Sequence, residues 1–159
     1  MKRLTLICAF ALVIAACGGS SQESDSTTSD ATADQASTTG ANPSYDPNRG
    51  EGKFHEVKLD TKLDGLLATN GEKISDLKCA SCHKMTDEKL VGPGWKGVTT
   101  RHQPEWIMNF ITNTDAMIDK DPKAQAMLEL CMVRMPNQNL SDGDARALLE
   151  YMRKIDGVK

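Results

Sequence analysis

Five consecutive residues, Cys79-Ala80-Ser81-Cys82-His83, constrain this chain more than any other part of its sequence. Cysteines three positions apart lie on one face of a helical turn, so both sulfur atoms can reach one edge of a planar macrocycle. A CxxCH sequence is typical of the attachment of a c-type haem, whose two vinyl groups bond to the thiols. The motif therefore predicts one covalent haem c, attached to Cys79 and Cys82 and bound through its iron by His83.

The composition fits a domain built around such a group. Hydrophobic residues make up 39% of the 159 residues and aromatic residues only 4%. That is little for a self-sufficient core, and a buried haem would supply the missing aromatic mass. The formal charge is −3, and no basic patch of the kind that nucleic-acid-binding proteins carry is present.

The chain begins with features of an export signal. A basic start, Met1-Lys2-Arg3, precedes an uncharged run from Leu4 to Ala16, which is shorter than the ~20 residues that span a bilayer. The sequence Ile14-Ala15-Ala16-Cys17-Gly18 resembles the lipobox of bacterial lipoproteins. It predicts a signal peptide over residues 1–16 and a lipidated Cys17 that anchors the exported protein to a bacterial membrane, facing the periplasm. An ordinary signal peptide with an incidental cysteine is the alternative.

Residues 17–50 have the composition of a linker. Small and polar residues dominate, no aliphatic side chain is larger than alanine, and the first basic residue is Arg49. Such a segment cannot bury enough apolar surface to offset its ordering entropy. We expect a disordered acidic linker with a root-mean-square span of about 30 Å.

The remaining residues have the periodicity of an all-α domain. Residues 51–70 are expected to form an N-terminal arm that leads into the first helix, and Gly71 then indicates either close helix packing or a helix start. A short helical turn with Thr86 as N-cap is expected over residues 84–90. Three helix starts follow, at Pro104, at Asp121-Pro122 and at Ser141-Asp142, because proline at the first position and Asp or Ser as N-cap favour them. The prediction is about four or five helices around one haem, in a domain over residues 71–159.

A loop after the haem motif bears on the iron ligand. Pro93, in Val91-Gly92-Pro93-Gly94-Trp95, has no amide hydrogen, so the carbonyl groups around it are free to accept. Such a carbonyl could accept from Nδ1 of His83 and leave Nε2 for the iron. Trp95 is expected to pack on the haem edge, to fill the core, or both.

Met135 is the favoured sixth ligand. It precedes Pro136 in the loop before the last helix, and the residue before a proline is biased away from α-helical geometry. A thioether on an extended loop can be presented to the iron opposite His83. The alternatives, in order, are Met132 and then His102, with His55 as a further imidazole.

Three segments in this order, CASCH, VGPGW and MPNQNLSD, resemble a class I cytochrome c over residues 71–155. The wider pattern, with GVTTR and PEWIMNFI, is similar to single-haem bacterial cytochromes that serve nitrous-oxide reductase or terminal oxidases. The resemblance implies an electron carrier rather than an enzyme, with a quinol-oxidising complex as donor. It also implies that His83 and Met135 are the axial ligands and that Pro93 orients His83. Arg101 and Trp106 become candidates for contact with a propionate or the haem surround. Cys131 departs from the pattern, because such proteins commonly carry an aromatic residue there.

Two other classes of function stay open at this point. A labile or absent methionine ligand would allow a haem peroxidase or a gas sensor. Without haem, Cys79, Cys82, Cys131 and a histidine could bind zinc, or Cys131, Met132 and Met135 could bind copper. Only one CxxC pair is present, which argues against a zinc ribbon.

Overall fold

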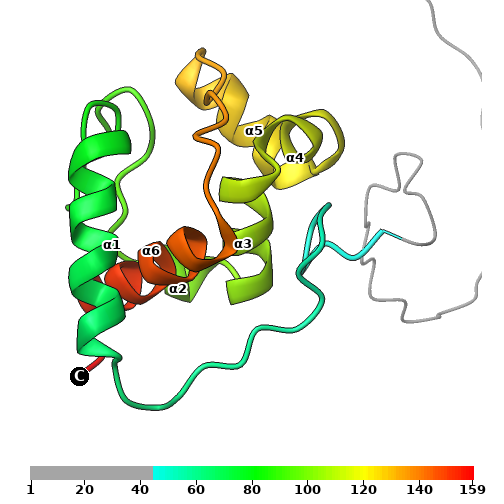
Figure 1. Cartoon of the computed structure of the whole chain (residues 1–159). Helices are drawn as coiled ribbons and strands as arrows, with labels where there is room; N and C mark the ends of the chain where they lie inside the picture. Colours follow the sequence, from blue (N-terminus) through cyan, green and yellow to red (C-terminus); the bar gives the residue numbers. More distant parts are fainter. Residues whose placement is uncertain (1–44) are drawn as a thin grey trace, which may run out of the picture. The chain divides into compact units, whose positions relative to one another are not determined.

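The computed structural model describes residues 45–159, which form six α-helices and no β-strand. The helices are α1 (Gly65–Lys78), α2 (Val98–Arg101), α3 (Pro104–Thr112), α4 (Thr114–Lys120), α5 (Pro122–Cys131) and α6 (Asp142–Ile155) (Figure 1). The predicted all-α class is confirmed. The expected number was four or five, because the short helices α2 and α4 have too few residues to show an amphipathic period. Among residues 45–159, no helix is long and apolar enough to cross a membrane.

The first and last helices form the most extensive helix pair of the domain. Gly71 is buried where α1 meets α6, and a Cβ atom there would overlap the carbonyl oxygen of Ala147. Close packing, rather than a helix start, therefore explains this glycine, which lies well inside α1. Ser141 caps α6 in a reciprocal capping box with Asp144, and buried α6 side chains such as Leu148 and Leu149 lie in the core.

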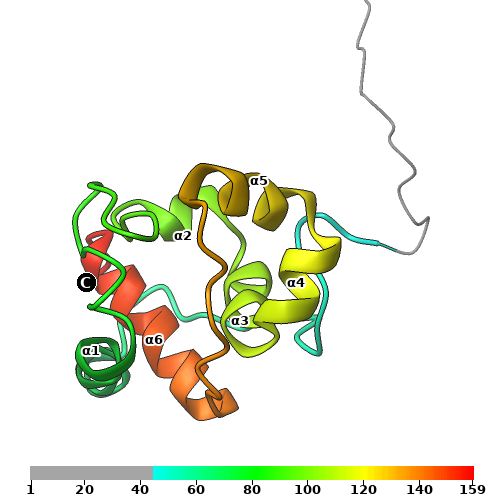
Figure 2. The same cartoon turned by 90° about the horizontal axis from the view of Figure 1, so that it is seen from above.

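The predicted caps of the middle helices are also present. Pro104 and Pro122 occupy the first turns of α3 and α5, and the Asp121 carboxylate accepts from the backbone amide of Ala124. In sequence order α3 packs against α4, and α4 packs against α5. The loop from residue 132 to residue 141 then leads from α5 to α6, with α1 and α6 on one side of it and α3 and α4 on the other (Figure 2).

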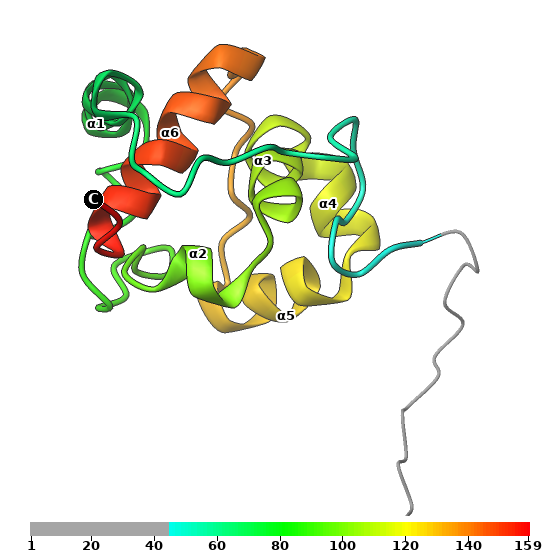
Figure 3. The ribbon, with the colours of Figure 1, turned by 90° about the horizontal axis from the view of Figure 1, so that it is seen from below.

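The segment before α1, residues 45–64, runs across one side of the helices. Figure 3 shows it running past α4, α3 and α6 to the start of α1. The amide of Phe54 donates to Asn109 over 2.9 Å, and the amide of Val57 donates to Glu105 over 2.7 Å. Farther along, Arg153 donates to the carbonyl of Asp60. Helix α1 begins at residue 65, inside the range that the sequence assigned to the arm.

Two sequence expectations need correction. Residues 45–50 were assigned to the disordered linker, but they pack on the helices, and Gly50 is buried against Met117 and Trp106. These six residues therefore belong to the folded part. The signal peptide, Cys17 and the rest of the linker lie outside the described residues.

The helical turn expected over residues 84–90 is absent from this segment. Backbone bonds to a later loop replace it, since Trp95 donates to the carbonyl of Lys84 over 2.9 Å and Lys96 donates to that of Thr86 over 3.1 Å. The Thr86 hydroxyl accepts from Glu88 in a local turn instead of capping a helix.

Candidate haem-binding site

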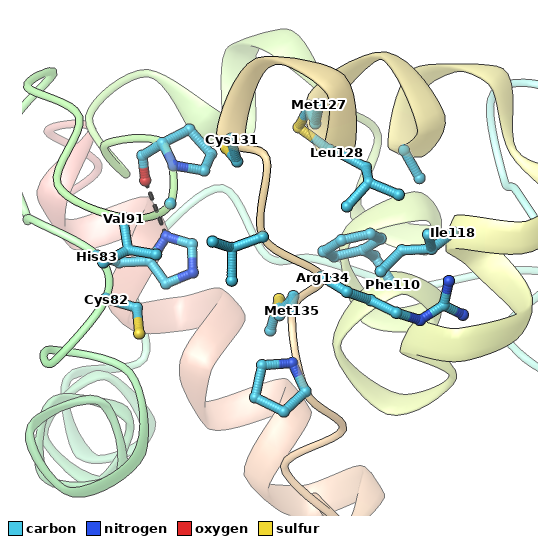
Figure 4. Close-up of a pocket in the computed structure, with 15 residues that line it drawn as sticks. Cys82, His83, Val91, Phe110, Ile118, Met127, Leu128, Cys131, Arg134 and Met135 are labelled. Atoms are coloured by element: carbon cyan, nitrogen blue, oxygen red, sulfur yellow. Dashed lines mark hydrogen bonds between the residues drawn. The ribbon is translucent and has the colours of Figure 1, made fainter.

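Two adjoining cavities lie beside the CxxCH motif. They hold about 570 and 600 Å³ of empty space, part of which is open to solvent. Five residues line both cavities: His83, Pro93, Phe110, Met127 and Met135. The lining is almost entirely apolar, as a porphyrin requires, and Figure 4 shows Cys82, His83 and Met135 around one of the cavities.

The two motif cysteines follow the end of α1. Cys79 is its C-cap, and the backbone amides of Cys82 and His83 both donate to the carbonyl of Cys79, over 3.0 and 2.9 Å. This single turn places both thiols and the histidine on one segment beside the cavities. Cys82 is half-buried and lines the first cavity, whereas Cys79 is buried and lines neither cavity. Burial raises the pKa of the Cys79 thiol to about 11.

The loop that contains Pro93 orients the ring of His83, the proposed axial histidine. Its Nδ1 atom lies 2.8 Å from the carbonyl oxygen of Pro93 (Figure 4). A carbonyl can only accept, so Nδ1 carries the proton and Nε2 keeps the lone pair that a metal needs. Burial lowers the pKa of His83, while the bond to Pro93 acts in the opposite direction. The neutral ring is the form that binds iron.

Gly92 explains why this loop can approach the ring so closely. Its amide donates to the carbonyl of Cys82 over 2.9 Å, and a Cβ atom at this position would overlap the His83 ring. The loop is therefore fixed to the motif itself. Sequence reasoning identified Pro93 but not this role of its neighbour.

Among the four candidates for the sixth ligand, Met135 alone lines both cavities together with His83. Its side chain is half-buried. Met132 is the C-cap of α5, has a left-handed backbone and is 85% exposed. It lines neither cavity.

The other two histidines differ in position. His55 is exposed on the arm. His102 lines the second cavity and stacks on Trp106, with ring centroids 4.1 Å apart. Burial, with Lys123 and Arg101 nearby, lowers the pKa of His102 to about 4. Its buried Nδ1 atom has no hydrogen-bond partner within the described part of the chain.

The predicted haem-surround residues all line the second cavity. Trp95 is buried, and its ring centroid lies 5.7 Å from that of His83. Its side chain therefore both fills the core and forms part of the cavity wall. Arg101 is exposed and donates to the carbonyls of Lys96 and Gly94, over 2.7 and 3.2 Å.

Trp106 lines the second cavity, but its N–H group already donates a hydrogen bond. The indole nitrogen donates to the Asp121 carboxylate over 2.9 Å. A propionate contact through this N–H, one of the two roles considered from the sequence, does not fit that arrangement. The ring instead stacks between His102 and Phe110.

One face of α5 closes the first cavity. The residues of this face are Ala124, Met127, Leu128 and Cys131, and sequence reasoning did not assign them to the haem. Met127 lines both cavities. The apolar period of α5 was the available signal, but periodicity alone cannot say which surface a helix covers.

A zinc site finds no support in the geometry, and among the residues considered for copper Met132 is 85% exposed and lines neither cavity. Within residues 45–159, no group of three or more His, Cys, Asp or Glu side chains is arranged to hold a metal ion.

Comparison with known proteins points in the same direction as the cavity. The cytochrome c family profile matches residues 68–156. The cytochrome c from Rhodothermus marinus is similar in structure, with a TM-score of 0.64 and 34% identity over 66% of this chain and 90% of that one. An engineered form of that cytochrome has a TM-score of 0.63, and the engineered form bound to a carbene intermediate one of 0.60; both are 33% identical over the same shares. No curated protein matches the chain.

Proposed function

Because the chain belongs to the cytochrome c family and so carries a covalently bound haem c for electron transfer, we propose that it is a membrane-tethered electron carrier with a six-coordinate His/Met iron. In this proposal Cys79 and Cys82 form the thioether bonds, and His83 and Met135 are the axial ligands. The carrier would pass single electrons from a quinol-oxidising complex to a terminal oxidase or nitrous-oxide reductase.

One observation carries the proposal. His83 and Met135 come from segments 52 positions apart and line the same two apolar cavities. An imidazole and a thioether are the ligand pair of carriers with a raised reduction potential. With both axial positions filled by protein, an iron exchanges electrons but has no site for a substrate.

The haem supplies the one-electron redox couple, and the residues of the chain prepare its surroundings. The Pro93 carbonyl fixes the His83 ring in one tautomer. The apolar side chains of Phe110, Ile118 and Leu128 line the first cavity and give it an apolar wall. Low polarity around an iron centre disfavours the more highly charged oxidised state, so it too raises the potential.

The surface beside the first cavity suits a brief encounter with a partner. Val91 and Val133 line that cavity and are 37% and 54% exposed, and Leu130 nearby is 72% exposed. Electron-transfer partners meet through small interfaces that separate quickly. A lipid anchor at Cys17 and the acidic linker would raise the effective concentration of partners in the same membrane.

Stopped-flow mixing tests the proposal. The reduced protein is mixed in turn with a terminal oxidase and with nitrous-oxide reductase, and the oxidised protein with membranes that contain a quinol-oxidising complex. We expect second-order electron exchange with one donor and one acceptor. Exchange with none of them, together with turnover of peroxide, would favour the haem peroxidase instead.

A further inference from the structure

Asp121 is a charged side chain with no exposed surface. A buried carboxylate is costly unless donors satisfy it, and three of them do. The indole of Trp106 donates over 2.9 Å, the backbone amide of Ala124 over 2.8 Å, and the hydroxyl of Tyr45 also donates to this carboxylate. All three are hydrogen bonds, so the carboxylate is held without an ion pair among the described residues.

The first two donors belong to two walls of the haem cavities. Trp106 lies on α3 and lines the second cavity, while Ala124 lies on α5 and lines the first. Helix α5 packs chiefly on α4. The bond from Trp106 to Asp121, which is the N-cap of α5, also joins the α5 wall to α3.

The third donor comes from the first residue that the structure describes. Tyr45 begins a segment that lies over this junction, where Lys123 donates to the carbonyl of Pro47 over 2.8 Å. Asn109, fully buried on α3, donates to the carbonyl of Arg49 over 3.0 Å. Gly50 has φ +70° and lies so close to Trp106 that a Cβ atom would be 3.2 Å from its ring. Residues 45–50 thus cover the carboxylate and keep water from it.

We propose that Asp121 is a positioning residue for the haem: it holds the Trp106 and α5 walls together so that the cavity stays closed and Met135 stays on the iron. Tyr45 is the third donor to Asp121, so the packing of residues 45–50 on the helices stabilises the closed form of the cavity. This inference rests on the proposed His83/Met135 ligation. Asp121 touches neither axial ligand and acts only through Trp106 and α5.

Competition with added imidazole measures this effect. Imidazole binds ferric iron only where Met135 has left, so its apparent affinity reports how firmly the cavity keeps the methionine in place. The variants are Tyr45→Phe, which deletes one donor, and Asp121→Asn. Asparagine caps a helix as well as aspartate does, so Asp121→Asn keeps the start of α5 while its NH₂ group cannot accept from Trp106 or Tyr45. The control, Asp76→Asn, makes the same charge change on the exposed face of α1.

We expect imidazole to bind Tyr45→Phe about fivefold more tightly than the wild type, the factor that corresponds to one net hydrogen bond of about 1 kcal/mol. Asp121→Asn loses two such bonds, so we expect it to bind imidazole about 30-fold more tightly. Asp76→Asn should bind imidazole like the wild type. Far-UV circular dichroism confirms that each variant is folded, and if Asp121→Asn fails to fold, Tyr45→Phe alone decides the question. Wild-type affinity in a folded variant would overturn the role of Asp121. Absence of the methionine–iron charge-transfer band in the wild type would instead overturn the proposed ligation itself.

Discussion

The Nδ1 atom of His83 lies 2.8 Å from the carbonyl oxygen of Pro93. The two residues are ten positions apart, and the loop between them is tied back to the motif, because the amides of Val91 and Gly92 both donate to the carbonyl of Cys82. The attachment motif and the group that orients its histidine therefore form one unit. This relationship explains why a loop rich in glycine and proline follows the motif.

Gly92→Ala tests that unit. The added methyl group would overlap the His83 ring, so the ring must turn and its bond to Pro93 weakens. We expect electron paramagnetic resonance of the oxidised variant to show a high-spin fraction that the wild type lacks. Gly143→Ala is the control, since a Cβ there has an ordinary contact of 3.8 Å with Ser141. A purely low-spin Gly92→Ala spectrum would contradict the proposed role of the loop.

Gly71→Ala tests the packing of α1 on α6. The new Cβ atom would overlap a backbone oxygen of Ala147, which cannot move without shifting α6. We expect the free energy of unfolding to fall by about 1–3 kcal/mol, the usual cost of overpacking. Gly65→Ala in the same helix meets nothing within 4 Å and should be neutral or gain up to about 1 kcal/mol. Denaturant titration of both variants makes the comparison, and equal stabilities would contradict the packing argument.

His102 should make stability depend on pH. Burial, with Lys123 and Arg101 nearby, lowers its pKa from 6.5 to about 4 in the folded chain. Between these two values the unfolded state binds more protons, so stability rises as the pH rises from about 4 to 6.5 and is fully present above that range. His102→Phe keeps an aromatic ring on Trp106 and removes the titrating group. We expect its free energy of unfolding to vary less over this range than that of the wild type, and an identical pH dependence would rule out the contribution of His102.

Cys17→Ser tests the proposed membrane anchor. Without the thiol the lipid cannot be attached, so the protein should move from the membrane fraction to the soluble fraction after export. Cys131→Ser is the matched control, because it removes a thiol from α5 and leaves Cys17 unchanged. Membrane association of Cys17→Ser equal to that of the wild type would contradict lipidation at this position.

The sequence predicted those parts of the site that depend on local chemistry. The CxxCH turn, the helix starts at Pro104 and Pro122, the Ser141 cap and the bond between His83 and Pro93 each rest on residue types at fixed spacings. Met135 lines the same two cavities as His83. Its bond to iron stays a prediction.

Contacts between distant segments could not be read from the sequence. Residues 45–50 have a linker composition, and only the burial of Asn109, Met117 and Asp121 beneath them explains their order. The sequence made Trp106 a candidate for the haem surround but gave no sign that its N–H donates to Asp121. Residues 84–90 suit a helical turn locally, yet their carbonyls bond to Trp95 and Lys96. In each case a partner far along the chain decides the outcome.

The absorption spectrum of the oxidised protein at neutral pH tests the central claim most directly. We predict a low-spin haem with the methionine–iron charge-transfer band, present in the wild type and in Met132→Leu but lost in Met135→Leu, because leucine has no sulfur to bind iron. Met135→Leu should also have a lower reduction potential. A wild-type spectrum without this band, or a band that survives in Met135→Leu, would contradict a carrier whose iron is closed by His83 and Met135.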